Sequence, residues 1–206
     1  MVDVSVLFIT FWLAAPSPAA VATQAFGSIT CEFRVFDGGN EISRETRVIV
    51  YPSGRSENGL RPDAAGRVSL APGLYDVQAI RERGGQVAGI RRVEHLLIQR
   101  YPDEQGYHLE IINFNAQYGA LELKTGGAVE YDAAAFTAGD RTRQVATALR
   151  GAGYLLFAVP AGRYDVRVKP AGASTPETWL TDIDVPQGRT RLRTFRPPDA
   201  RPFGGR

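Results

Sequence analysis

Short runs in which apolar and polar residues alternate follow one another along most of the chain. Side chains of a β-strand point to opposite faces in turn, so this alternation predicts half-buried strands. The predicted strands span residues 29–36, 47–51, 68–70, 75–79, 92–100, 107–114, 118–124, 129–136, 153–159, 164–168, 179–185 and 189–195. Glycine, proline and asparagine separate many of these runs, as in Asp37-Gly38-Gly39-Asn40. Such spacing is typical of β-sandwiches.

One phrase occurs twice along the chain. The first copy is Leu70-Ala71-Pro72-Gly73-Leu74-Tyr75-Asp76-Val77 and the second is Val159-Pro160-Ala161-Gly162-Arg163-Tyr164-Asp165-Val166. Each copy reads as an apolar strand end, a turn, a glycine and a new strand that begins Tyr-Asp-Val. The two tyrosines lie 89 residues apart, which indicates that one structural unit is duplicated.

The repeat predicts an all-β fold of two tandem antiparallel β-sandwiches, immunoglobulin-like or transthyretin-like, after a signal peptide. The expected boundaries are a signal peptide at 1–22, a linker at 23–26, the first sandwich at 27–115, a linker at 116–118, the second sandwich at 119–196 and a disordered tail at 197–206. Because the linker at 116–118 is short, we expect a limited range of relative orientations. Each unit is long enough to bury one core between two sheets.

Two stretches need a closer interpretation. Residues 140–150 fit either a short helix that Asp140 caps and Gly151 ends, or a strand followed by a turn, and the repeat favours the strand. The loop at 101–106 predicts a hairpin that connects the strands at 92–100 and 107–114.

The N-terminal segment resembles an export signal. Residues 4–15 are almost entirely apolar, and Ala20-Val21-Ala22 has the small-x-small pattern of a cleavage site. The apolar run is shorter than the ~20 residues of a membrane span, so we expect no stable membrane span after cleavage and a periplasmic or extracellular location. The segment before the apolar run holds Asp3 and no Lys or Arg, which leaves a misassigned start site, atypical export or a buried segment as alternatives.

Charge and cysteine content exclude some classes of function. The net charge is +2 and the basic residues form no block, so no nucleic-acid partner is predicted. Cys31 is the single cysteine; it forms no internal disulfide and lies at an apolar position of a predicted strand, where we expect it to be buried. Arg189, Arg191 and Arg193 alternate along the last strand and Arg196 follows. They predict a solvated sheet edge or, alternatively, a strip that binds anionic glycans or a partner.

The Tyr-Asp-Val phrase predicts a structural role. We expect each tyrosine hydroxyl to bind a backbone group and each aspartate to accept hydrogen bonds from turn amides. Asp76 and Asp165 belong to different units, so they do not form a catalytic pair. The only histidines, His95 and His108, lie on the two strands of the predicted hairpin, near Tyr101 and Tyr107. A metal site there is the alternative hypothesis to two structural strand residues.

The repeated phrase resembles the transthyretin-like, or carboxypeptidase-regulatory-like, β-sandwich domains of bacterial secreted proteins. The resemblance is loose in the first copy and closer in the second, and it extends over most of 27–196. The residues that carry it are Leu70, Pro72, Gly73, Tyr75 and Val77 in the first copy and Val159, Pro160, Gly162, Tyr164 and Val166 in the second. It implies a general-purpose module rather than a chemistry. Intradiol dioxygenases share this sandwich core but use a His-x-His pair, and hydroxyisourate hydrolases end in Tyr-Arg-Gly-Ser; this chain has neither feature.

The sequence therefore predicts an exported, non-catalytic binding or structural module. We expect it to recognise a protein or carbohydrate of the cell envelope through sheet edges and the loops at 53–66 and 170–178. No catalytic, cofactor-binding or metal-binding residue and no cofactor is predicted. The alternatives are a metal-dependent enzyme that uses His95 or His108, and an accessory subunit of a cell-surface assembly.

Overall fold

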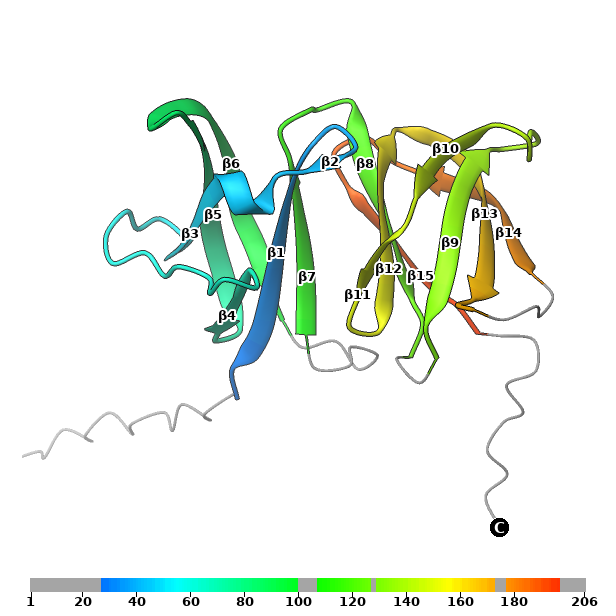
Figure 1. Ribbon diagram of the computed structural model, residues 1–206. Helices are drawn as coiled ribbons and strands as arrows, with labels where there is room; N and C mark the ends of the chain where they lie inside the picture. The colour runs from blue at the N-terminus through cyan, green and yellow to red at the C-terminus, as the bar shows by residue number, and fades with distance from the viewer. Residues whose placement is uncertain (1–26, 100–106, 127–128, 173–176, 197–206) are drawn as a thin grey trace, which may run out of the picture.

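The computed structural model describes residues 27–99, 107–126, 129–172 and 177–196, and Figure 1 shows how they are arranged. The predicted signal peptide at 1–22, the linker at 23–26 and the disordered tail at 197–206 lie outside the described residues. The predictions for these segments are therefore not addressed by the structure.

The described chain is built from β-strands, as the alternating pattern predicts, with one short 3-10 turn, η1 (Ser43–Glu45). The strands of the first half are β1 (Ile29–Asp37), β2 (Asn40–Glu41), β3 (Thr46–Pro52), β4 (Arg67–Leu70), β5 (Gly73–Arg83), β6 (Gln86–Ile98) and β7 (Tyr107–Asn113). The strands of the second half are β8 (Tyr118–Lys124), β9 (Tyr131–Thr137), β10 (Gln144–Thr147), β11 (Leu149–Gly151), β12 (Tyr154–Pro160), β13 (Gly162–Pro170), β14 (Thr178–Val185) and β15 (Thr190–Thr194).

The first half forms a sandwich of two sheets. In sheet A, β1 pairs with β2, β4 and β7, and sheet B has the order β3-β5-β6. Apolar side chains on alternate positions of β1, such as Cys31 and Phe33, pack with Val77 and Ala79 of β5 between the sheets. Cys31 is fully buried, which confirms its predicted environment.

The second half repeats this arrangement. Sheet C has the order β11-β12-β8-β15 and sheet D has the order β10-β9-β13-β14. Its core includes Leu121 and Leu123 of β8, Phe157 of β12 and Val166 of β13. The first and last strands of each half pair in parallel, β1 with β7 and β8 with β15. This shared topology agrees with the duplication that the sequence predicts, and the all-β sandwich fold is confirmed.

Two uncertain stretches are resolved by the strand pairing. Residues 144–147 and 149–151 form β10 and β11, which pair with β9 and β12, so the strand prediction for 140–150 is confirmed and the helix alternative is wrong. The predicted hairpin between the strands at 92–100 and 107–114 is wrong, because β6 belongs to sheet B and β7 pairs with β1 in sheet A. The loop at 101–106 lies outside the described residues.

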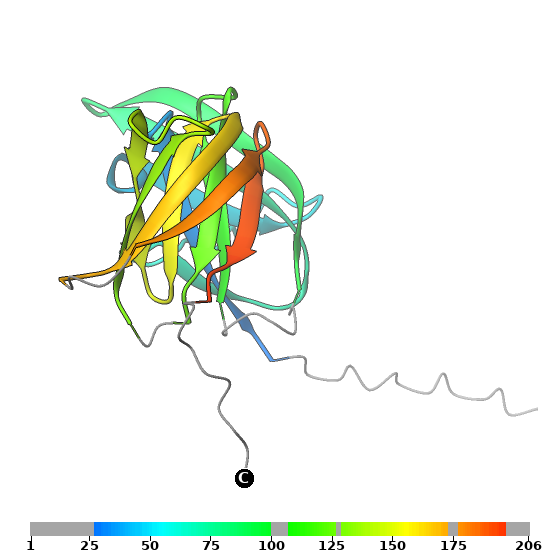
Figure 2. The same ribbon diagram turned by 90° about the vertical axis from the view of Figure 1, so that its right-hand side faces the viewer.

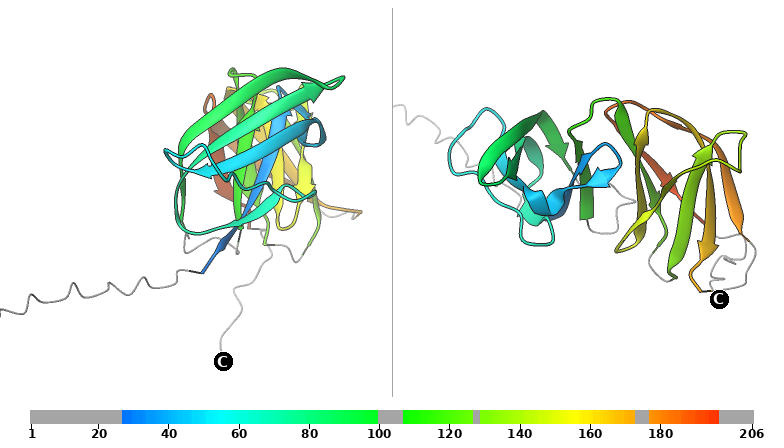
Figure 3. Two further views of the ribbon diagram at one scale, coloured as in Figure 1. Left: turned by 90° about the vertical axis from the view of Figure 1, so that its left-hand side faces the viewer. Right: turned by 45° about the horizontal axis from the view of Figure 1, so that its top comes forward.

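The position of β7 explains why it is apolar on both faces. Ile112 points into the core of the first sandwich, and Leu109 packs against the second sandwich. Figure 1 shows the result, four sheets stacked in the order B, A, C, D. Figure 2 faces sheet D at one end of the stack, and the left view of Figure 3 faces sheet B at the other end.

The repeated phrase forms the same corner in both sandwiches. The Tyr75 hydroxyl donates to the Ala71 carbonyl at 2.8 Å, and the Tyr164 hydroxyl donates to the Pro160 carbonyl at 2.6 Å. Each tyrosine thus bonds the backbone four residues earlier and fixes the turn between two core strands. This confirms the predicted role of the tyrosines.

The aspartate of each phrase accepts two backbone amides from neighbouring strands and turns. Asp76 accepts from Gly54 and His95, both at 2.9 Å. Asp165 accepts from Gly139 at 3.3 Å and from Asp182 at 3.0 Å. His95 and Asp182 have positive φ angles of 56° and 54°, at a register shift of the strand pair in each sandwich. In each sandwich, the aspartate carboxylate therefore accepts a hydrogen bond from the backbone amide of a bulge residue with positive φ. This confirms the predicted structural role of the aspartate.

Replacing Asp165 with alanine will destabilise the fold. The side chain is buried, and its loss leaves two backbone amides without their acceptor, which we expect to cost about 1–3 kcal/mol of unfolding free energy. Urea titration measures this as a lower midpoint at unchanged slope. The control is Asp184→Ala, since Asp184 is exposed and, within the ranges that the structure describes, its carboxylate pairs only with Arg191 at the surface. Equal effects of the two substitutions would contradict this role for Asp165.

Candidate functional site

The two sandwiches meet through the outer faces of sheets A and C. Phe36 and Leu109 from sheet A pack with Tyr154, Leu156 and Ala158 from sheet C in a continuous buried cluster. Phe36 and Leu156 are completely buried. Apolar surface removed from water stabilises such contacts in proportion to its area, so the two sandwiches are held together by a core of their own.

A buried carboxylate lies within this contact. Glu32 of β1 is 3% exposed, and its Oε1 accepts a hydrogen bond of 2.6 Å from the Tyr154 hydroxyl of the second sandwich. Arg34 Nε donates to the same oxygen at 3.0 Å, and Arg67 Nε donates to Oε2 at 3.1 Å. A buried charge is costly unless it is paired and hydrogen-bonded, and here both oxygens have donors.

The hydrogen bonds outweigh the cost of burying Glu32. Burial favours the protonated acid, but the bonds from Tyr154, Arg34 and Arg67 favour the carboxylate, and its pKa lies below the ordinary value of 4.5. Burial and the neighbouring Glu32 raise the pKa of Tyr154. The phenol therefore keeps its proton and donates a hydrogen bond to the Glu32 carboxylate. The pair is therefore a neutral donor and an ionised acceptor that join the two sandwiches.

Near the connection between the two sandwiches, Asn113 holds the turn at Gly38 within the first sandwich, and this turn contacts Tyr118 of the second. Asn113, at the end of β7, accepts from the Gly38 amide at 3.1 Å and donates to the Gly38 carbonyl at 2.9 Å. The Tyr118 ring, at the start of β8, lies against the same glycine, where a Cβ would be 3.3 Å from the ring. Gly38 has a φ of +62°, so a side chain there would be both strained and crowded.

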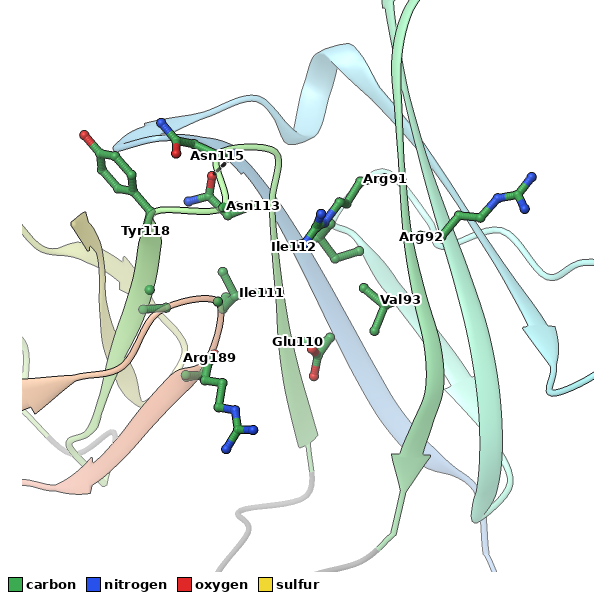
Figure 4. Close-up of a pocket in the computed structure, with 15 residues that line it drawn as sticks. Arg91, Arg92, Val93, Glu110, Ile111, Ile112, Asn113, Asn115, Tyr118 and Arg189 are labelled. Carbon is green, nitrogen blue, oxygen red and sulfur yellow. Dashed lines mark hydrogen bonds between the residues drawn. The ribbon is translucent and has the colours of Figure 1, made fainter. Parts of the chain in front are cut away.

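A pocket of about 190 Å³ opens beside this interface. Strands β6 and β7 of the first sandwich line one part of it, and the start of β8 and the turn before β15 line the other. Figure 4 shows that Arg91 points from β6 toward β7, while Arg92 points to the opposite side of β6. Arg189 comes from the second sandwich, and Glu110 lies between Arg91 and Arg189 in this view.

Two of the three arginines that line the pocket, Arg91 and Arg189, are available to a ligand. Arg91 and Arg189 are exposed, and among the described residues neither forms an ion pair or a side-chain hydrogen bond. Glu110 Oε2 lies 3.6 Å from His108 Nε2. The pocket thus combines two guanidinium groups, which are forks of hydrogen-bond donors, with one carboxylate acceptor.

The backbone around Arg189 is fixed by a close approach to β8. The Arg189 carbonyl accepts from the Ala120 amide at 3.0 Å, and the Gly188 amide donates to the Tyr118 carbonyl at 2.9 Å. A Cβ at Gly119 would lie only 2.2 Å from the Pro186 carbonyl oxygen. Glycine at this position therefore lets the turn that carries Arg189 lie against β8.

The structure does not bring the two histidines together on paired strands. His95 lies in the bulge of β6 in sheet B and is exposed, whereas His108 lies on β7 in sheet A beside Cys31 of β1. Within the described ranges, no group of three or more His, Cys, Asp and Glu side chains is arranged to hold a metal ion. The geometry on which the metal hypothesis for His95 and His108 relied is therefore wrong.

The other predicted contact regions are partly occupied by internal bonds. Leu60, within the loop at 53–66, forms two backbone hydrogen bonds of 2.8 Å with Val50 of β3. In the arginine strip, Arg191 bonds the Asp184 carbonyl at 3.0 Å, while Arg189 lines the pocket. Residues 173–176 of the loop at 170–178 lie outside the described residues.

Glu110 is a site residue that the sequence did not reveal, and the sequence did not separate Arg91 from Arg92. The pair Arg91-Arg92 is visible as a basic dipeptide, but the sequence does not tell which of the two faces β7. Alternation along β7 places Glu110 on the face of Ile112 rather than Leu109. The face on which Glu110 lies identifies it as a pocket residue only once β7 is known to pair with β1 in sheet A.

Comparison with known proteins gives no family for this chain. No family model and no curated protein matches its sequence. Among solved structures it is similar to the Bacillus anthracis TIE protein, with 15% identity, 82% of this chain and 34% of that chain covered and a TM-score of 0.29. A putative adhesin from Bacteroides ovatus matches with 11% identity, coverage of 92% and 96% and a TM-score of 0.27.

The minor pilin GBS52 of Streptococcus agalactiae matches with 11% identity, coverage of 85% and 99% and a TM-score of 0.26. The chain thus spans about one third of the length of the TIE protein chain and nearly all of the other two. Identities and TM-scores this low do not indicate a shared function. Over the part of the chain that the structure describes, no helix is long and apolar enough to span a membrane.

Replacing Tyr154 with phenylalanine will weaken the contact between the sandwiches. The substitution keeps the buried ring but removes the hydroxyl that donates to Glu32. We expect a loss of about 1.5–3 kcal/mol of unfolding free energy, the range for a hydrogen bond to a charged group. The comparison is Tyr107→Phe, because that ring packs on the same cluster and its hydroxyl donates a longer hydrogen bond of 3.4 Å to another buried carboxylate, Glu122. A smaller loss of unfolding free energy for Tyr154→Phe than for Tyr107→Phe would refute the role given to the hydrogen bond between Tyr154 and Glu32.

Stability will fall in acid partly through Glu32. Its pKa is lower in the folded protein than the ordinary 4.5, so its contribution is fully present above that pH and is lost as the pH falls through the lowered pKa. Asp76 acts in the same direction, because amides of His95 and Gly54 lower its pKa. Unfolding free energies measured from neutral pH to about pH 3 should fall less steeply for Glu32→Gln than for the unchanged protein. Parallel curves would show that Glu32 makes no such contribution.

Proposed function

We propose that the protein is an exported, non-catalytic module that binds a protein or carbohydrate partner of the cell envelope at the pocket between its two sandwiches. The observation that supports this proposal is the pair formed by Arg91 and Arg189. These exposed guanidinium groups come from different sandwiches and line one concavity. Arginine is well suited to such recognition because its planar fork of donors binds carboxylates and similar groups in a bidentate manner.

The interface between the sandwiches supports the same proposal. A site that is built from two domains binds tightly only if the domains are already in place, because ordering them on binding costs free energy. The buried contact between Glu32 and Tyr154 and the apolar cluster around it hold the two sides of the pocket in position. The partner then meets Arg91 and Arg189 without a rearrangement of the sandwiches.

We further propose that each sandwich is a transthyretin-like domain, with boundaries at 27–115 and 119–196. Support comes from the Gly-x-Tyr-Asp-Val phrase, which forms the corner between two core strands at Tyr75 and again at Tyr164. Export to the periplasm or the cell exterior is supported by the apolar run at 4–15 and the small-x-small pattern that follows it.

The binding function is tested with an envelope fraction immobilised on beads. We expect the full chain to be retained, and we expect the double variant Arg91→Ala/Arg189→Ala to bind at least roughly tenfold more weakly, since each hydrogen bond to a charged group contributes about 1.5–3 kcal/mol. The matched control is Arg92→Ala, which removes an arginine that points away from the pocket. Thermal unfolding of each variant shows whether it is folded.

Two results would count against the proposal. One is an unmodified protein that the envelope fraction does not retain. The other is retention that Arg92→Ala reduces as much as the double variant does, because binding would then depend on general positive charge and not on the pocket.

A further inference from the structure

The chemistry of the pocket narrows the class of ligand, an argument that rests on the proposed binding function. Arg91, Arg189 and Glu110 are the charged side chains that face the pocket, whereas Arg92, which also lines it, points to the opposite side of β6. Two positive charges and one negative charge leave a net charge of +1, so the pocket favours a net anion. A neutral sugar or a zwitterion gains less from this field.

The size of the pocket limits what enters it. Its volume of about 190 Å³ is below the ~300–1,000 Å³ of pockets that enclose drug-sized ligands. It therefore takes one small group, such as a single sugar ring or one side chain, while the rest of the partner lies outside.

Two kinds of anion fit a pocket of this size, an acidic peptide side chain and an acidic sugar, and Glu110 favours one of them. The carboxylate of an acidic peptide side chain only accepts hydrogen bonds, so it pairs with Arg91 and Arg189 but offers no donor to Glu110 and repels it. An acidic sugar carries both a carboxylate, which accepts hydrogen bonds, and hydroxyl groups, which donate them, on one ring. Its carboxylate pairs with guanidinium groups, and its hydroxyls donate to a carboxylate acceptor such as Glu110.

We infer that the pocket binds a uronic acid residue of an acidic polysaccharide. Arg91 and Arg189, one from each sandwich, lie on either side of Glu110 (Figure 4), so one of them pairs with the sugar carboxylate, the other donates to oxygens of the sugar, and Glu110 accepts from the ring hydroxyls. The ligand thereby supplies the counter-ion that the two arginines do not have among the described residues. Binding also adds a link between the sandwiches, because its two main contacts come from β6 and from the turn before β15.

The inference is tested with trimers of galacturonic, glucuronic and mannuronic acid, each compared with the neutral trimer of the parent sugar. Isothermal titration calorimetry with the full chain should detect binding of at least one acidic trimer and at least tenfold weaker binding of its neutral counterpart. Arg91→Ala and Arg189→Ala should each weaken binding by roughly 10- to 100-fold, the factor for a lost hydrogen bond to a charged group. The Arg92→Ala control should change it little.

Glu110→Gln separates an acidic sugar from an acidic peptide. Removing this carboxylate takes away an acceptor for sugar hydroxyls and also a charge that repels carboxylates. We therefore expect the variant to bind a triglutamate peptide more tightly than the unmodified protein does, and to gain less or lose affinity for the acidic trimer. If triglutamate binds the unmodified protein as tightly as the acidic trimer, the inference of a sugar is wrong.

Failure of this inference can be told apart from failure of the proposed function. If no acidic trimer binds more tightly than its neutral counterpart, while retention by the envelope fraction still depends on Arg91 and Arg189, the pocket binds a partner of another class and the inference of a uronic acid is wrong. If retention does not depend on the two arginines either, both proposals are wrong.

Discussion

The hydrogen bond between the Tyr154 hydroxyl and the Glu32 carboxylate is the contact on which the arrangement of the two sandwiches depends. It joins β1 of the first sandwich to β12 of the second at 2.6 Å, inside a cluster of buried apolar side chains. A buried carboxylate tolerates few alternative arrangements, because any shift that breaks its bonds leaves a charge without partners in a medium of low dielectric constant. Apolar contacts hold the sheets together, and the polar contacts select one way of packing them. The pocket depends on that selection, since Arg91 and Arg189 belong to different sandwiches.

Duplication explains the fold, and the differences between the two copies explain the site. Both sandwiches use the same tyrosine corner and the same aspartate bulge, at Asp76 and at Asp165. These side chains form hydrogen bonds with backbone groups, and the same residue types occur in both units. The outer faces of sheets A and C are not equivalent, because one provides Glu32 and the other provides Tyr154. A contact between unlike faces joins the two copies in a defined order and leaves sheets B and D at the ends of the stack (Figure 1).

The strands, the duplication and the roles of Tyr75 and Asp76 were predictable from the sequence, because alternation and turn residues are local signals. The partner of β7 was not. Sequential strands often form hairpins, and nothing local shows that β7 crosses to sheet A and pairs in parallel with β1. The contact between the sandwiches could not be predicted from the sequence either, for a different reason. Glu32 and Arg34 lie at the polar positions of an alternating strand, a pattern that a solvated face and a buried polar face share. Only the second sandwich, which supplies Tyr154, tells the two apart.

The most direct test of a fixed arrangement is the measurement of backbone residual dipolar couplings in both sandwiches of the weakly aligned protein. If the buried contact around Glu32 and Tyr154 holds the two sandwiches as one body, a single alignment tensor will fit the couplings of the strand residues of both sandwiches together, with the orientation seen in the structure. Two tensors of different magnitude, one for each sandwich, would show that the sandwiches move independently, and a pocket built from both would then lose its physical basis.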